Sequence, residues 1–342
     1  MPLTMTGSRP ERKASAPGPS RRALLRALLG AGAVAGLTVP HPAQALVMGA
    51  LRLLVPGGQG GGWDTAARIV GQGLLDEGLV ARLHYENYSG GWGMRALIHL
   101  IAQGRPDMMM VQSQSLILTG LTGDFRLTFR DVLPLATVMR EYQILVVERD
   151  SPFTTARAFF DHQRQNPAHT PVGGGSARWG LDHVCAGLMV EAAGGNPAAL
   201  RYIPHDAGTE ALNALLAGET AALVTGIAET RQAVLGGRVR VLGVTSPERL
   251  WGYDWPTLFE QGIPMIFQNW RGFFAAPSVS ADARDRLTRV LTLLTTHAAW
   301  TRTCERMGWL PSLTVGDGMG AALEAEEARM KTALDRLGFR KG

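Results

Sequence analysis

Apolar residues along this chain fall into two alternating patterns. Short apolar runs are typical of buried strands, whereas longer stretches with an apolar residue every three or four positions are typical of amphipathic helices. Four of the short runs end in a glycine-rich loop that leads into a helical stretch, and these runs span 51–55, 81–88, 170–172 and 200–204. Strands that alternate with helices of about 10–15 residues are typical of parallel βαβ units. The pattern therefore predicts an α/β fold.

The rest of the chain continues this alternation. Further strands are predicted at 145–148, 221–225, 240–245 and 267–275. Helices are predicted at 94–103, 154–165, 180–193, 210–217, 228–235, 281–300 and 318–337. The strands near 145 and 270 lie where the chain would leave one lobe and later return to it. We therefore expect two α/β lobes joined by a hinge, with lobe 1 formed by 46–147 and 270–342 and lobe 2 by 148–269.

The first 45 residues have the features of a secretory signal peptide. Arg21 and Arg22 precede an apolar stretch that runs to Val39, and Ala43 and Ala45 form the small-residue pattern of a signal-peptidase site. The paired arginines favour the twin-arginine export route. The apolar stretch is short for a membrane-spanning helix, and no second apolar run of about 20 residues follows it, which disfavours a stable membrane anchor. We expect an exported, periplasmic protein.

The charge of the chain depends on this segment. Six of the 34 basic residues and one of the 29 acidic residues lie in 1–45, which leaves 28 of each sign in the rest of the chain. A balanced chain lacks the basic footprint that nucleic-acid-binding proteins carry. We therefore expect no nucleic acid among its partners.

The first glycine-rich loop has the composition of an anion-binding loop. Five glycines lie within 57–62, and Asp64 follows as the predicted N-cap of the next helix. Glycine lets the backbone approach a ligand closely, and the free N–H groups at a helix N-terminus favour anions. No Gly-Lys-Ser/Thr ends the loop, and Trp63 inside the turn argues against a dinucleotide fingerprint. The loop is either an ordinary βα turn or a cradle for a small anion, and the three further glycine loops favour the cradle.

Residue types that serve catalysis or metal binding form no recognisable pattern. Cys185 and Cys304 lie in helical patterns among apolar neighbours, so we expect two buried free thiols. The histidines show no zinc-ligand spacing, and neither a metal nor a cofactor is predicted. Ser176 lacks a nucleophile elbow and is expected to cap a helix or bind a ligand. Asp182 and His183 are adjacent on a helix and face different directions, which indicates a structural pair.

Several motifs resemble, in order, those of the solute-binding receptors of tripartite tricarboxylate transporters (the Bug/TctC type). The matching segments are 55–56, 60–68, 87–93, 174–177, 182–183, 202–210, 243–249, 256–262 and 269–272. They cover essentially the whole chain after position 45. The GGGWD and NWRG elements are most similar to the tricarboxylate-type branch of the family.

The resemblance implies a two-lobed periplasmic-binding-protein fold of the Venus-flytrap, type II-like kind, with parallel-rich mixed sheets flanked by helices. It implies a monomeric receptor, without a cofactor, that captures a small di- or tricarboxylate, citrate-like, and delivers it to the integral membrane subunits of a transporter. Backbone N–H groups of the first two loops would hold one end of the ligand, and lobe 2 would hold the other. The candidate ligand-binding residues are Gly57, Gly58, Gly60, Gly61, Gly62, Trp63, Asp64, Ser89, Gly90, Gly91, Trp92, Gly93, Ser113, Gly175, Ser176, Ala177, Arg178, Asp206, Gly208, Thr209 and Thr225.

Three positions depart from the family pattern beside the expected cleft. These are Gln59, Trp92 and the Arg178–Trp179 pair. Arg178 either contacts an extra carboxylate of the ligand with both guanidinium nitrogens or points to solvent.

Two other functions stay open at this stage. The same receptor could present its ligand to a sensor kinase instead of a transporter. A periplasmic hydrolase that uses Ser176 or Asp64 would need a base within reach, for which the chain offers His183 and His205.

Overall fold

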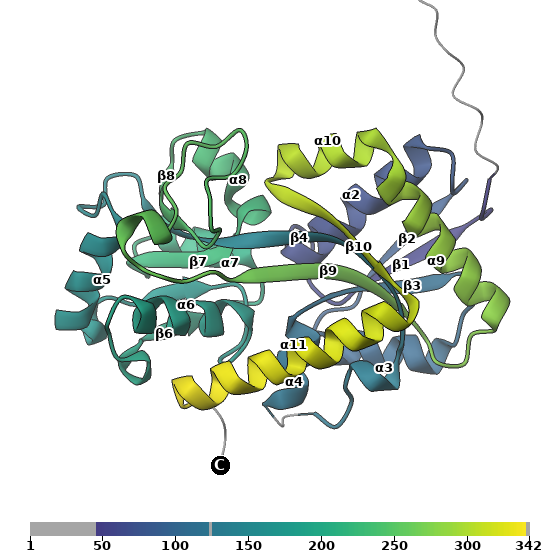
Figure 1. The fold of residues 1–342 in the computed structure, drawn as a ribbon, viewed down its shortest axis with the longest axis horizontal. Coiled ribbons are helices and arrows are strands. Elements are labelled where there is room, and N and C mark those ends of the chain that lie inside the picture. Colours follow the sequence, from purple (N-terminus) through teal and green to yellow (C-terminus); the bar gives the residue numbers. More distant parts are fainter. Residues whose placement is uncertain (1–45, 123–124, 340–342) are drawn as a thin grey trace, which may run out of the picture. The chain divides into compact units, whose positions relative to one another are not determined.

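The computed structural model describes residues 46–122 and 125–339, which Figure 1 shows as a ribbon. The predicted signal peptide, 1–45, lies outside these residues, so its cleavage and its export route stay predictions. Within the described part of the chain, no helix is long and apolar enough to span a membrane.

Lobe 1 contains a parallel sheet. β1 (Leu51–Val55) pairs in parallel with β2 (Leu83–Asn87) on one side and with β3 (Met108–Ser113) on the other. The helices α2 (Gly62–Asp76) and α3 (Met94–Gln103) pack against this sheet. Every residue of β3 is buried, which explains why its sequence shows a continuous apolar run and no alternation.

Lobe 2 contains a second parallel set of strands. β5 (Val172–Gly174) lies between β6 (Tyr202–Pro204) and β7 (Ala222–Gly226) and is parallel to both. β5 and β6 each end in a loop that leads into a helix, as the sequence predicts, whereas β7 runs directly into the helix that begins at Ile227. In parallel sheets such loops lie together at the carboxyl ends of the strands.

Two long strands connect the lobes. β4 (Leu133–Glu148) pairs antiparallel with β9 (Gln268–Ala275) over 133–142, and from Gln143 onward it pairs with β7 and β8 (Val239–Val244). Figure 1 shows β4 and β9 running side by side from one lobe to the other. They contain the crossings expected near 145 and 270. The lobe boundaries at 147/148 and 269/270 themselves stay predictions.

The other regular elements lie around these sheets. β10 (Trp309–Val315) pairs antiparallel with β4. The further helices are α4 (Ser115–Leu121), α5 (Ala156–Gln165), α6 (Leu181–Ala192), α7 (Gly208–Leu216), α8 (Ile227–Leu235), α9 (Ala281–Thr296), α10 (Ala298–Met307) and α11 (Gly316–Leu337). Short 3₁₀ turns are η1 (Gly91–Gly93), η2 (Phe129–Asp131), η3 (Pro167–His169), η4 (Pro197–Ala199) and η5 (Phe259–Gln261).

Most predicted elements are present, and one predicted helix is divided into two. The helix α3 has the predicted bounds. The single helix expected over 281–300 is two helices, because His297 adopts extended backbone angles (φ −79°, ψ 135°) between α9 and α10. Its Nδ1 lies 2.7 Å from Oε2 of Glu77. The sequence did not predict β3, α4, β10 or the first half of β4.

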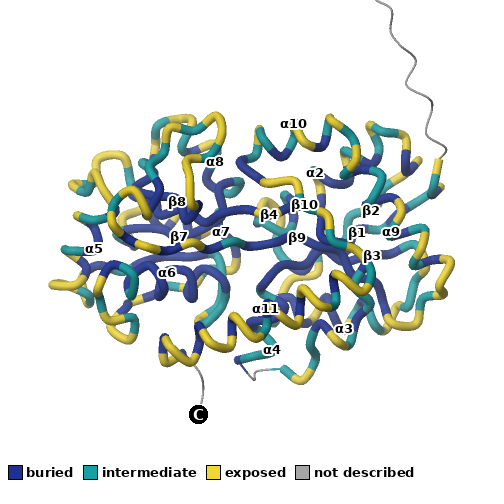
Figure 2. The backbone as a smooth tube through the Cα atoms, in the orientation of Figure 1, coloured by how far each residue is buried: buried dark blue, intermediate teal, exposed yellow. Residues whose placement is uncertain are grey.

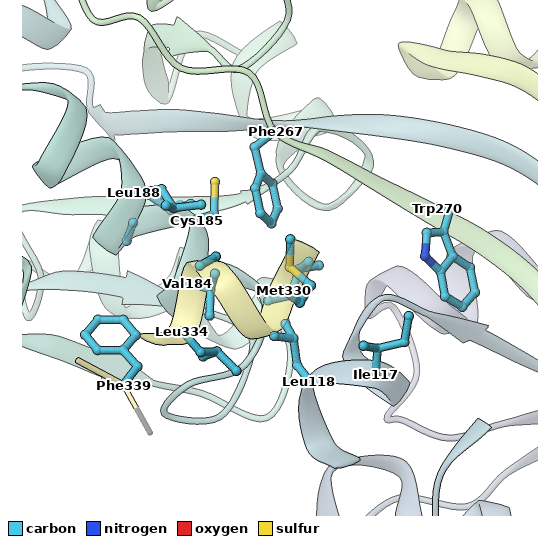
Figure 3. Packing of buried hydrophobic residues seen from close by; sticks show 14 of the residues in the cluster. Ile117, Leu118, Val184, Cys185, Leu188, Phe267, Trp270, Met330, Leu334 and Phe339 are labelled. Atoms are coloured by element: carbon cyan, nitrogen blue, oxygen red, sulfur yellow. The ribbon is translucent and has the colours of Figure 1, made fainter. Parts of the chain in front are cut away.

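The C-terminal helix packs against elements of both lobes. α11 contacts α4 and α6, and Figure 3 shows Met330 and Leu334 of α11 beside Leu118 and Val184. Figure 2 shows β4 and β9 largely buried and much of α11 exposed. The apolar face of α11 therefore forms a further connection between the lobes, in addition to β4 and β9.

Both cysteines are free and buried, as predicted. Cys185 lies in α6 and Cys304 in α10. Burial raises the pKa of the Cys304 thiol to about 12 and also raises the pKa of Cys185, so neither is a thiolate at neutral pH.

Candidate functional site

The glycine loop after β1 leads directly into α2. The helix begins at Gly62 with Gly61 as its N-cap, so the prediction of Asp64 as the N-cap is wrong. Gly61 can serve because its backbone is extended (φ −73°, ψ 171°) and its carbonyl accepts the first helical hydrogen bond, from Thr65 N–H at 2.9 Å. Asp64 lies in the first turn, where its Oδ2 accepts the N–H of Gly60 at 2.9 Å.

The Asp64 carboxylate fixes the loop by several hydrogen bonds. It also accepts from Arg68 Nε at 2.8 Å and from Asn87 Nδ2 at 2.9 Å. Burial by itself would raise the pKa of this carboxyl, but the hydrogen bonds from Arg68, Gly60 and Asn87 outweigh burial and lower it. Asn87 Nδ2 also donates to the carbonyl of Gly57 at 2.9 Å. Asp64 is therefore a charged residue that orders the loop from within.

The loop after β2 packs against this first loop. A Cβ at Gly93 would lie 3.3 Å from Pro56 and 3.5 Å from the ring of Trp63. The φ of Gly93 is +93°, a conformation that glycine adopts without strain. Trp63 Nε1 donates to Ser113 Oγ at 3.2 Å. The end of β3 therefore also adjoins the glycine loop after β1.

In lobe 2, the loop after β5 is tied to the start of α6. The N–H of Gly175 donates to Asp182 Oδ2 at 2.8 Å, and the N–H of Asp182 donates to Ser176 Oγ at 2.9 Å. The Ser176 hydroxyl also lies 3.2 Å from the hydroxyl of Tyr202. Of the two roles expected for Ser176, the structure shows the one at the helix N-terminus.

The glycine loop of lobe 1 lies against the N-cap and the first turn of α7 in lobe 2. A Cβ at Gly61 would lie 3.4 Å from the Cβ of Ala207, and a Cβ at Gly60 would lie 3.7 Å from Cγ2 of Thr209. A hydrogen bond also crosses between the lobes, from Gly62 N–H to Glu229 Oε1 at 2.9 Å. The candidate residues of these two segments therefore lie together.

Glu229, in the first turn of α8, collects donors from three segments. Its Oε1 accepts the N–H of Gly62 and, at 3.2 Å, the N–H of Gly208. Its Oε2 accepts the hydroxyl of Thr225 at 2.7 Å. Glu229 was not among the predicted site residues: Thr225 ends β7 and Glu229 lies in α8, so no spacing within one element connects the two.

A buried ion pair between β9 and β4 lies against the same loop. Arg271 Nη2 is 2.6 Å from Glu141 Oε1, which also accepts from Asn269 Nδ2 at 2.9 Å. A Cβ at Gly62 would lie 2.4 Å from Arg271 Nη2, so the guanidinium directly adjoins Gly62. Arg271 and Asn269 belong to the NWRG element of the sequence, but their role was not predicted.

Residues 85–317 match the family described as tripartite tricarboxylate transporter family receptor, called TctC. The chain belongs to this family. It is 28% identical over 245 residues to the UPF0065 protein in the tcbD-tcbE intergenic region of a Pseudomonas species, with 68% of this chain and 70% of that protein covered. Family members are periplasmic solute-binding receptors and not enzymes, as the sequence led us to expect.

Two solved structures show the same fold. The periplasmic binding protein BugD has a TM-score of 0.76 at 19% identity, with 86% of this chain and 99% of that chain covered. MatC from Rhodopseudomonas palustris, solved with bound malate, has a TM-score of 0.71 at 18% identity, with 84% and 99% covered. The predicted periplasmic-binding-protein fold is therefore confirmed.

The Asp182–His183 pair of this TctC receptor is built into the core of lobe 2. The His183 ring stacks between Tyr202 and Phe339, with centroid distances of 4.3 and 4.4 Å, and its Nδ1 accepts the N–H of Trp179 at 2.8 Å. Burial lowers the pKa of His183 to about 3, so the imidazole is neutral. The stacked ring serves packing, as expected for a structural histidine.

Asp182 faces the other way from His183. Its Oδ1 accepts from Gln143 Nε2 at 2.8 Å, in addition to the N–H of Gly175 on Oδ2. Burial, reinforced by the negative charge of Glu229, raises the pKa of Asp182 well above its usual range. Asp182 is thus a buried hydrogen-bonding group that ties β4 and the loop after β5 to α6, and its charge is suppressed.

The remaining candidate residues of the receptor divide into two sets. Gly58, Ser89, Gly90, Gly91 and Ala177 lie in the loops described above. Trp92, Arg178 and Asp206 are exposed, and Trp92 has a left-handed φ of 53°. Among residues 46–122 and 125–339, no group of three or more His, Cys, Asp or Glu side chains could hold a metal ion.

Proposed function

We propose that this receptor captures a small dicarboxylate or tricarboxylate, citrate-like, between its two lobes and delivers it to the integral membrane subunits of a tripartite tricarboxylate transporter. The proposal assigns the ligand site to the loops after β1 and β2 in lobe 1, and to the loops after β5 and β6 and the end of β7 in lobe 2. Export through the twin-arginine route, on the evidence of Arg21 and Arg22, would bring the receptor to the periplasm.

One observation carries the proposal. Backbone N–H groups of Gly62 and Gly208, which lie in different lobes, both donate to the carboxylate oxygen Oε1 of Glu229. Each belongs to the first turn of a helix, where unpaired N–H groups and the helix dipole favour an anion. A carboxylate at this place interacts with both lobes at once, which is the requirement for closure on a ligand.

The malate-bound relative supports a carboxylate as the ligand class. MatC and this receptor share the fold, and malate is a small dicarboxylate. Backbone amides and the hydroxyl of Thr225 can donate hydrogen bonds to a carboxylate without forming a salt bridge with it. This suits a ligand that has to be released again.

The test is a thermal-shift screen of the protein recovered from the periplasm, followed by calorimetric titration. Malate, succinate, adipate and citrate would be compared with their uncharged amides, and each mixture would be assayed for product. We expect at least one acid to raise the melting temperature with no product formed, and its amide to have no effect. If no acid binds, or if an uncharged compound binds equally well, the proposal is wrong.

A further inference from the structure

Glu229 occupies the place where a ligand carboxylate would be bound. Both of its oxygens are engaged, one by the amides of Gly62 and Gly208 and the other by the Thr225 hydroxyl. The donors come from both lobes. Gly62 and Gly208 lie more than 140 residues apart in the chain. The carboxylate of Glu229 therefore makes the contacts that the proposed function assigns to the ligand.

The packing leaves no room for a second carboxylate on the same donors. A Cβ at Gly208 would lie 2.5 Å from the Glu229 carboxyl carbon, and a Cβ at Gly62 would lie 3.4 Å from it. The carboxyl group is thus in close contact with both glycines. A ligand can reach these amides only when Glu229 has left them.

The charges around Glu229 also argue against a second carboxylate beside it. Arg271 adjoins Gly62 and is already paired with Glu141 at 2.6 Å. A ligand carboxylate added beside Glu229 would place three anions around one cation, and like charges at short range repel strongly where water is scarce. Exchange of one carboxylate for another avoids this cost, because the number of negative charges on the donors does not change.

We propose that Glu229 is an internal carboxylate that competes with the ligand and thereby sets the affinity and the specificity of the receptor. This inference rests on the proposed function, which supplies the chemical class of the ligand. Without ligand, Glu229 bridges the two lobes through Gly62 and Gly208. A ligand carboxylate displaces it and takes over the two amides and the hydroxyl of Thr225. Only ligands that supply a carboxylate able to replace that of Glu229 bind well.

Removal of the competitor should strengthen binding. Glu229→Ala is expected to bind malate or citrate about tenfold or more tightly than the parent, because every receptor molecule then has its amides available. Glu229→Gln keeps an oxygen acceptor but loses the charge, and its affinity should lie between the two. Glu219→Ala, which removes an exposed acid of the same lobe, is the matched control and should bind as the parent does. Calorimetry measures the affinities, and melting curves show that each variant is folded.

A second measurement does not depend on the ligand. Spin labels on cysteines introduced at exposed Gln72 in lobe 1 and exposed Asn213 in lobe 2 report the distance between the lobes. In the ligand-free protein, Glu229→Ala should give a longer or broader distance distribution than the parent, whereas Glu219→Ala should not. The native thiols are buried and do not interfere.

The outcomes separate this inference from the proposed function. If Glu229→Ala opens the lobes but neither parent nor variant binds any carboxylate, the internal bridge is supported and the proposed ligand class is wrong. If the parent binds a carboxylate and Glu229→Ala binds it more weakly or equally well, Glu229 is not a competitor. An unchanged lobe distance in Glu229→Ala likewise overturns the inference.

Discussion

Arg271 and Glu141 form an ion pair between the two strands that connect the lobes. Arg271 Nη2 lies 2.6 Å from Glu141 Oε1, and the side chains are only 7% and 1% exposed. A charge buried to this extent depends on its partner, because removal of one member leaves the other without water or counterion. Loss of either partner is therefore expected to destabilise β4 and β9 at the point where the loops of both lobes meet.

The first prediction concerns this pair. Arg271→Met should lower the free energy of unfolding by about 3–5 kcal/mol, because Glu141 would remain buried and uncompensated. The double variant Arg271→Met with Glu141→Gln should lose less than the sum of the single changes. Urea denaturation measures both.

The matched control uses an exposed arginine. Arg249 pairs with Glu260 at 2.9 Å, but both side chains are more than 40% exposed. Arg249→Ala should therefore cost about 0–1 kcal/mol. Equal losses for Arg249→Ala and Arg271→Met would show that burial does not govern these pairs.

The second prediction compares two glycines of one loop. A Cβ at Gly62 would lie 2.4 Å from Arg271 Nη2, whereas a Cβ at Gly58 would have no atom within 4 Å. Gly62→Ala should therefore displace the guanidinium and weaken carboxylate binding about tenfold or more, a loss of about 1.4 kcal/mol. Gly58→Ala keeps the backbone N–H and displaces no atom, so it should lose much less affinity than Gly62→Ala. Calorimetric titration decides, and similar affinities for the two variants would contradict the placement of the ligand beside Gly62.

The third prediction is a pH dependence caused by His183. The native protein takes up this proton only near pH 3, whereas an unfolded chain takes it up near pH 6.5. Between these values the unfolded state binds more protons, so stability falls as the pH falls, by at most about 1.4 kcal/mol per pH unit for this group. Well above pH 6.5, where the ring is neutral in both states, the group has no effect.

The test replaces the titrating ring. His183→Gln keeps an acceptor for the N–H of Trp179 but cannot be protonated. The stability of the parent relative to this variant should be constant from pH 7 to 8 and should decrease from pH 6 to 4. Urea denaturation at each pH gives the difference, and a constant difference over the whole range would disprove the assignment.

The fourth prediction concerns export. Arg21→Lys combined with Arg22→Lys should abolish transport, since the twin-arginine receptor recognises the guanidinium pair and not its charge alone. Arg9→Lys combined with Arg12→Lys is the control and should be exported. Cell fractionation measures both, and mass spectrometry of the exported parent should place its N-terminus near Leu46. Normal export of the Arg21/Arg22 variant would indicate the general secretory route.

Local patterns in the sequence determined much of the fold. The strand, glycine loop and helix units follow from periodicity and from the properties of glycine, which act within a few residues. The bounds of α3, the βα loops of both lobes and the two buried thiols could be predicted for this reason. The break at His297 could not, because helical periodicity is the same on both sides of it and the extended residue carries no local signal.

Only the tertiary structure decided how the candidate site is assembled. The sequence placed Gly62 and Gly208 in two separate glycine loops and Thr225 at the end of a strand, and it offered no reason to connect them with Glu229 or with Arg271. Hydrogen bonds across the lobes depend on the distance between segments far apart in the chain, which β4 and β9 set through their pairing. The amino-acid sequence shows which donor and acceptor groups the chain contains. Which acceptor a buried donor finds is decided by packing, since an unpaired polar group in the interior is too costly to leave.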